Sequence, residues 1–187
     1  MRERTFEREF MREFDILFSP KCDKIFEESP NLEIREIAKF LKGRSLSPYC
    51  RSIAVRMVDC GSSNDVELEE GLTGSAQVDC ERFGIHFVAS PRHADVIIVT
   101  GPVSVNMKLA LEKTFNAMPK PSAVVAAGDG ACTGGVLSGA SGVYKSGRVE
   151  EVVPVDVKVA GNPPSPYALV LGILKAGEII SKKKSRR

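Results

Sequence analysis

The stretch that decides the fold is ADVIIVTG, at residues 94–101. Its centre consists of consecutive β-branched residues, and Thr100-Gly101 ends it. A short apolar run of this kind, bounded by turn residues, is typical of a strand buried on both faces, as in parallel sheets. Similar runs lie on either side of it in the sequence, IAVRMV at residues 53–58 and SAVVAA at residues 122–127. We therefore predict a parallel sheet with these three runs as strands.

The segments between and around these strands have helical features. Residues 104–118 carry apolar side chains at helical spacing before Pro119, and a C-terminal helix is expected from about Ser165 to Ile180. A polar helix is expected to begin at residues 62–65. Further strands are expected at 85–89 and 152–159. The alternation of strands and helices predicts an α/β fold, a flavodoxin-like parallel sheet flanked by helices.

Ligands of open α/β sheets bind beyond the carboxyl ends of the strands. The loops at Cys60, Gly130 and Asn162 each follow an expected strand directly. We therefore expect these loops to converge on one edge of the sheet.

The chain is expected to have three parts. Residues 1–46 form an N-terminal helical extension with amphipathic helices at 1–18 and around 32–41, residues 47–181 form the flavodoxin-like domain, and residues 182–187 form a basic tail. The extension either packs on the core of the domain or lies in a groove of another subunit.

Composition excludes several classes of function. The net charge of the 187 residues is only +2, which does not indicate a nucleic-acid partner. The five cysteines lack the density of a secreted disulfide scaffold, which favours a reducing compartment. No apolar run approaches the roughly 20 residues of a spanning helix, so any membrane association is expected to come through partner subunits.

Several motifs in order carry a family resemblance. They are DCG at residues 59–61 with Glu67 shortly after it, residues 92–101, the glycine-rich residues 128–135, and residues 153–164, which end in GNPP. The chain resembles the small, cluster-carrying subunit of complex I, and its counterpart in energy-converting membrane-bound nickel-iron hydrogenases and formate hydrogenlyases. The likeness covers roughly residues 47–180.

The resemblance implies a role in an oxidoreductase complex. In that family the domain holds one 4Fe-4S cluster, transfers electrons through it, and docks on the large hydrogenase-type or complex I-type subunit. A ferredoxin-like subunit and, through the complex, membrane subunits would be further partners. The implied location is peripheral, at the cytoplasmic side of the membrane, and the chain would be a subunit rather than an enzyme alone.

The family's cluster-ligand positions correspond to Cys60, Ser63, Gly130 and Asn162 here, so only Cys60 retains a cysteine. Cys132 is a candidate displaced ligand. Glu67 matches a family position next to the cluster, although it also suits the first turn of a helix as a favourable charge. A cubane cluster needs a ligand, usually a thiolate, on each iron, so we expect the 4Fe-4S cluster of the family to be lost or altered.

These observations leave three functional hypotheses. The first is an electron-transfer subunit with an altered cluster. The second is a clusterless structural or assembly subunit of a membrane-associated oxidoreductase complex. The third is a free flavodoxin-like protein that binds an anion or a flavin with residues 128–135. No residues resemble a nucleophile-base pair.

Overall fold

The computed structural model describes residues 35–36, 52–135, 138 and 146–185. The chain divides into two compact units, Met1–Ser45 and Leu46–Arg187. Arg35 and Glu36 are helical, and the rest of the expected N-terminal helices lies outside the described residues. The second unit holds all the other described residues.

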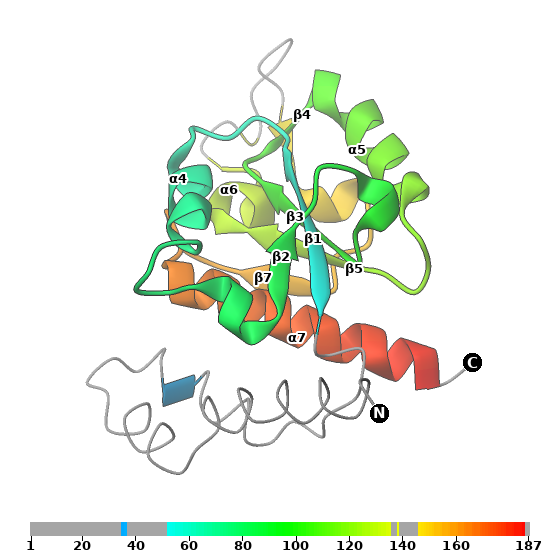
Figure 1. The fold of residues 1–187 in the computed structure, drawn as a ribbon. Coiled ribbons are helices and arrows are strands. Elements are labelled where there is room, and N and C mark those ends of the chain that lie inside the picture. Colours follow the sequence, from blue (N-terminus) through cyan, green and yellow to red (C-terminus); the bar gives the residue numbers. More distant parts are fainter. Residues whose placement is uncertain (1–34, 37–51, 136–137, 139–145, 186–187) are drawn as a thin grey trace, which may run out of the picture. The chain divides into compact units, whose positions relative to one another are not determined.

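A five-stranded parallel sheet forms the centre of this unit (Figure 1). Its strand order is β2-β1-β3-β5-β7, the order of flavodoxin-like sheets, which confirms the expected fold class. The strands are β1 (Ile53–Asp59), β2 (Ile85–Phe87), β3 (Val96–Thr100), β5 (Ala123–Ala127) and β7 (Val157–Val159). The deciding stretch is the central strand β3, and all its residues are buried because helices cover both faces.

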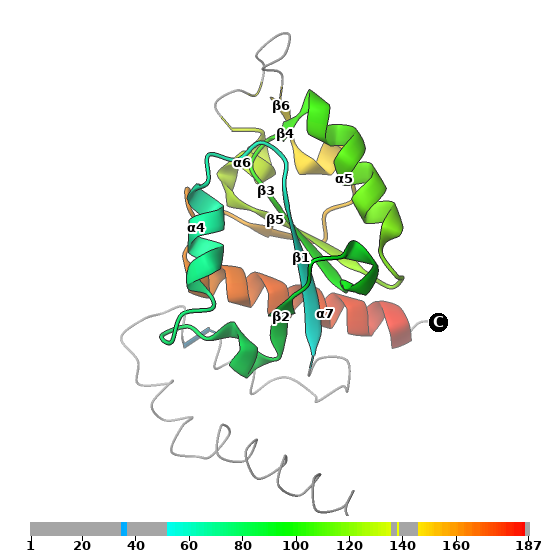
Figure 2. The same cartoon turned by 45° about the horizontal axis from the view of Figure 1, so that its top comes forward.

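Helices cover the sheet from both sides (Figure 2). Helix α7 (Pro166–Ser185) packs along β5 and β7 and also contacts α4 (Asp65–Leu72). On the opposite face, Leu111 of α5 (Val105–Ala117) lies in one buried cluster with Ile97 and Val124. Alternate side chains of each strand thus pack against the helices on opposite faces of the sheet.

Short elements complete the unit. Strands β4 (Val103–Ser104) and β6 (Ser146–Gly147) form an antiparallel pair. The remaining elements are the 3-10 helices η2 (Cys80–Phe83), η3 (Pro91–His93) and η5 (Val149–Glu151), and the short helix α6 (Gly128–Thr133). None of the helices in the described part of the chain is both long enough and apolar enough to cross a membrane.

The last strand is shorter than the sequence pattern predicts. The pattern extends over residues 152–159, but only Val157–Val159 pair in β7. Pro154 has no N–H for a ladder. Asp156 bonds to β5 in two ways: its N–H donates to Val124 O at 2.9 Å, and its Oδ2 accepts from the N–H of Val124 at 3.1 Å.

Helix α7 runs further than predicted and includes the first residues of the expected basic tail. Lys183 Nζ lies 2.7 Å from Asp156 Oδ1 and donates to the carbonyl of Ser122 at 3.0 Å. These contacts tie the last turn of the helix to the amino end of β5.

Candidate functional site

The loops at the carboxyl ends of β1, β3, β5 and β7 meet, as expected for Cys60, Gly130 and Asn162 and the segments around them. An ideal Cβ on Gly101, after β3, would overlap the backbone of Ser62, after β1. Asp129 follows β5, and its N–H donates to Gly161 O at 2.8 Å, while its Oδ1 accepts from the Gly161 N–H at 2.9 Å. This edge of the sheet is the candidate functional site.

Cys60 belongs to the core rather than to the surface of this site. Its side chain has 0% exposure and lies in the apolar cluster beneath α5. Its N–H donates to Thr100 O, and its carbonyl accepts from the N–H of Ser104. Burial, with a smaller effect from Asp59, raises the pKa of the Cys60 thiol to about 12. The thiol is therefore protonated at neutral pH in the chain as described.

Ser63 lies on an exposed turn after β1. Its hydroxyl donates to Asp65 Oδ1 at 2.8 Å. The turn is held by Asp59, whose Oδ1 accepts from the N–H groups of Gly61 and Ser62 at 2.8 Å each. Asn64 follows with a left-handed backbone, φ 69°, and α4 begins after it. Polar contacts within the chain thus account for the conformation of this turn.

Glu67 connects α4 to the end of the central strand. Its Oε2 accepts from the Ser62 hydroxyl at 2.5 Å, and its Oε1 accepts from the Thr100 hydroxyl. Glu67 also lies in the acidic first turn of α4, the second role expected for it. Both carboxylate oxygens are engaged, so the side chain acts as a brace between two loops of the candidate site.

Gly130 lies within α6 rather than in a loop, and this corrects the prediction of an irregular glycine segment. An ideal Cβ at position 130 would lie 2.9 Å from Pro102 Cδ and 3.3 Å from Pro102 N. A cysteine there would meet a rigid ring and backbone. Pro102 therefore occupies the space into which a side chain at this family ligand position would extend.

Asn162 is exposed in the loop before α7. Ser165 caps that helix, because its Oγ accepts from the Ala168 N–H at 3.2 Å, and Pro166 starts it. These contacts account for the position at which α7 begins.

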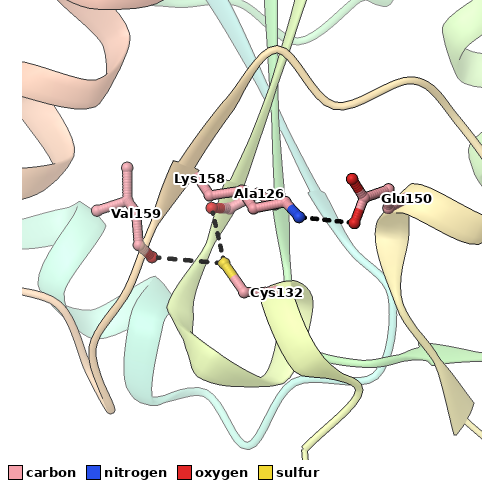
Figure 3. A network of polar contacts seen from close by, with 5 residues as sticks. All are labelled: Ala126, Cys132, Glu150, Lys158 and Val159. Carbon is pink, nitrogen blue, oxygen red and sulfur yellow. Dashed lines mark hydrogen bonds and ion pairs between the residues drawn. The ribbon is translucent and has the colours of Figure 1, made fainter.

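Cys132 faces the sheet (Figure 3). Its Sγ lies 3.6 Å from Ala126 O and 3.9 Å from Val159 O, the carbonyls near the ends of β5 and β7. Burial raises the pKa of this thiol. Beside it, Lys158 Nζ and Glu150 Oε2 form an ion pair at 2.6 Å. These contacts match a structural thiol better than a metal ligand.

The residues at the family's cluster positions do not fit a 4Fe-4S cluster. Such a cluster is held by four thiolates. Among residues 35–36, 52–135, 138 and 146–185, no three His, Cys, Asp or Glu side chains could together hold a metal ion. One buried thiol, a hydroxyl, a glycine and an exposed amide do not supply four thiolates.

Sequence reasoning missed two features of the site. The sequence pattern indicates Pro102 only as the end of a strand, and its approach to Gly130 depends on two loops distant in sequence. The pattern places Glu70 among the charges of a polar helix start, but its side chain has only 7% exposure. The spacing of Val66, Glu70 and Thr73, which recur at helical intervals, could have predicted that Glu70 lies on the buried side of the helix. All three residues are buried.

Comparisons with known proteins agree with this fold and motif order. The profile of the family described as "NADH ubiquinone oxidoreductase, 20 Kd subunit" matches residues 60–176. A subunit of the NADH-quinone oxidoreductase of Desulfovibrio desulfuricans is 44% identical over 64% of this chain and 63% of its own length. Formate hydrogenlyase subunit 7 of Escherichia coli is 34% identical over 81% of this chain and 59% of its own. The matches thus span less than two thirds of each of these two relatives.

A solved structure agrees as well. One chain of the membrane-bound sulfane sulfur reductase, described as an archaeal respiratory membrane complex, superimposes with a TM-score of 0.62. It is 29% identical, and the match covers 74% of this chain and 75% of that one. Because the family profile spans more than half of the sequence, the chain belongs to the family of the NADH ubiquinone oxidoreductase 20 kDa subunit.

Proposed function

We propose that this chain is a clusterless subunit of a membrane-associated, complex I-like or hydrogenase-like oxidoreductase, in which it docks on the large catalytic subunit. Its place is peripheral, at the cytoplasmic side of the membrane. Its role is structural or in assembly, and electrons pass through other subunits of the complex.

The observation that carries this proposal is the approach of Pro102 to Gly130. A family ligand position that had merely lost its cysteine would still have room for a side chain. Here the Cβ direction of Gly130 leads to Pro102 Cδ at 2.9 Å. Together with the burial of Cys60, this packing supports a site that has been remodelled as protein interior.

The exposed rim of the same edge is the proposed docking surface for the large subunit. It consists of short polar side chains and small loops, including Ser63, Asp129 and Asn162, all exposed. The contacts between Asp129 and Gly161 hold two of its loops in place. Loops that are already held in place lose less conformational entropy when a partner binds, so association costs less free energy.

The test is purification of the tagged full chain from the membranes of its native host under anaerobic conditions. We expect a large-subunit homologue to co-purify and iron per chain to stay at background. Formate hydrogenlyase subunit 7, reconstituted in parallel with iron and sulfide, is the control for cluster loading. Broad visible absorbance with a low-temperature EPR signal from this chain would overturn the clusterless role. The absence of any large-subunit homologue would overturn the docking role.

A matched pair of variants tests the docking edge itself. Asn162→Arg places a large charge on the proposed rim, and His93→Arg does the same on η3 at the amino end of β3. We expect only Asn162→Arg to lower the yield of the co-purified large subunit. Equal yields from the two variants would place docking elsewhere.

The alternative of an anion or flavin site at residues 128–135 gains no support from the contacts. Among the described backbone amides, Asp129 donates to Gly161 O, Gly134 donates to Gly130 O and Gly135 donates to Thr133 Oγ1. These donors are engaged within the protein, so they do not form a free anion-binding nest.

A further inference from the structure

Helix α4 has an inverted arrangement of polar and apolar side chains. Leu68 and Leu72 are 64% and 50% exposed, whereas Glu70 is 7% exposed. A helix on a sheet normally turns its apolar side chains inward and its charges outward. Breaks in this pattern are expected at functional or strained positions.

The buried carboxyl of Glu70 is incompletely bonded. Within the described part of the chain, its Oε2 is the buried side-chain oxygen or nitrogen atom without a hydrogen-bond partner. An ionised carboxylate in such a place loses the solvation of its charge and gains no donor in return. Protonation removes the charge, which is the larger part of that penalty.

The neighbouring carboxylate adds to this effect. Glu67 precedes Glu70 by one helical turn, and its two oxygens accept from the hydroxyls of Ser62 and Thr100. The negative charge of Glu67 disfavours a second charge on Glu70.

The charged groups that act on Glu70 come from two elements. Glu67 belongs to α4 itself, and Arg56 of β1 acts in the opposite direction. Helix α7 also packs on α4. Burial first and Glu67 second outweigh Arg56 and raise the pKa of Glu70 to about 7.

We propose that Glu67 and Glu70 form a proton-binding site in which the proton resides on the buried carboxyl of Glu70. The ligand is a single proton, taken up at Glu70 and released to solvent, with no change in any other bond. Glu67 connects this site to Ser62 and Thr100, at the carboxyl ends of β1 and β3. It does not depend on the docking role proposed above.

The experiment is a carbon-13 NMR titration of the glutamate side-chain carboxyls in the isotope-labelled full chain. Glu70→Gln assigns the signal of Glu70. We expect that signal to titrate with a midpoint near pH 7. Relative to an ordinary glutamate, this is a proton affinity roughly 300-fold higher. A midpoint in the ordinary glutamate range overturns the proposal.

Two further variants separate a proton site from simple burial. Glu67→Gln removes the like charge and should lower the midpoint of Glu70, whereas Arg56→Gln removes the opposite charge and should raise it. Glu69→Gln, on the same helix, is the matched control and should leave the midpoint unchanged. If the midpoint of Glu70 shifts equally in all three variants, or in none of them, the proposal that Glu67 and Glu70 form one site is wrong. If Glu67→Gln does not fold, the wild-type midpoint and the Arg56→Gln shift remain decisive.

Discussion

A methyl group at position 130 tests the packing that replaces the family's ligand position. Gly130→Ala places a Cβ 2.9 Å from Pro102 Cδ, well inside the roughly 3.5 to 4.0 Å at which carbon atoms attract each other. Overpacking of this kind costs typically about 1–3 kcal/mol. The gain in helix propensity from glycine to alanine, about 1 kcal/mol at most, partly offsets that cost. We expect a net loss of about 0–2 kcal/mol in the free energy of unfolding.

Gly71→Ala is the matched control, because Gly71 is also helical and its added Cβ meets nothing within 4 Å. That variant should gain about 0.5–1 kcal/mol. The two variants carry the same chemical change, so the difference between them, about 1–3 kcal/mol, measures the contact with Pro102. Urea unfolding of the full chain, followed by circular dichroism, gives both values.

A double-mutant cycle identifies the contact. Pro102→Ala removes the ring atom nearest to the new methyl group, so the combination with Gly130→Ala should lose less than the two single changes together. If Gly130→Ala is as stable as Gly71→Ala, the space at position 130 is open and the remodelling argument fails.

Contacts elsewhere in the structure lead to three more predictions. Between pH 4.5 and 7 the folded chain keeps the proton of Glu70 and the unfolded chain releases it. The free energy of unfolding should therefore fall by about 3 kcal/mol as the pH rises over that range, and then level off. Urea titrations at several pH values should show this slope in the wild type and should not show it in Glu70→Gln. Asp129→Ala removes the acceptor of the Gly161 N–H and should cost about 0.5–1.5 kcal/mol, whereas Asp129→Asn, which keeps a carbonyl oxygen, should cost less. Gly172→Ala places a Cβ against Val159 Cγ2 and should lower the melting temperature, and Val159→Ala in the same chain should restore part of the loss; an unchanged melting temperature would contradict the close packing of α7 on β7.

The strands and long helices were predictable because each has a local pattern. The run at residues 94–101 is β3, and the helix expected at 104–118 is α5 (Val105–Ala117). The terminal strand was overestimated at 152–159, because apolar composition alone does not show that the side chain of Asp156 accepts from the backbone of β5. The helical state of Gly128–Thr133 was missed, since glycines carry a weak helical preference that packing against β5 and β7 overcame.

By itself, the sequence determined the order of strands and helices and the family, because these depend on residue type and spacing along the chain. It also predicted that Ser63, Gly130 and Asn162 stand at cluster-ligand positions of the family. Only the tertiary structure decided what surrounds these three residues. The contact of Gly130 with Pro102 and the burial of Glu70 join residues from different loops and layers. Such contacts depend on how the sheet twists and the helices pack, and no local pattern encodes them.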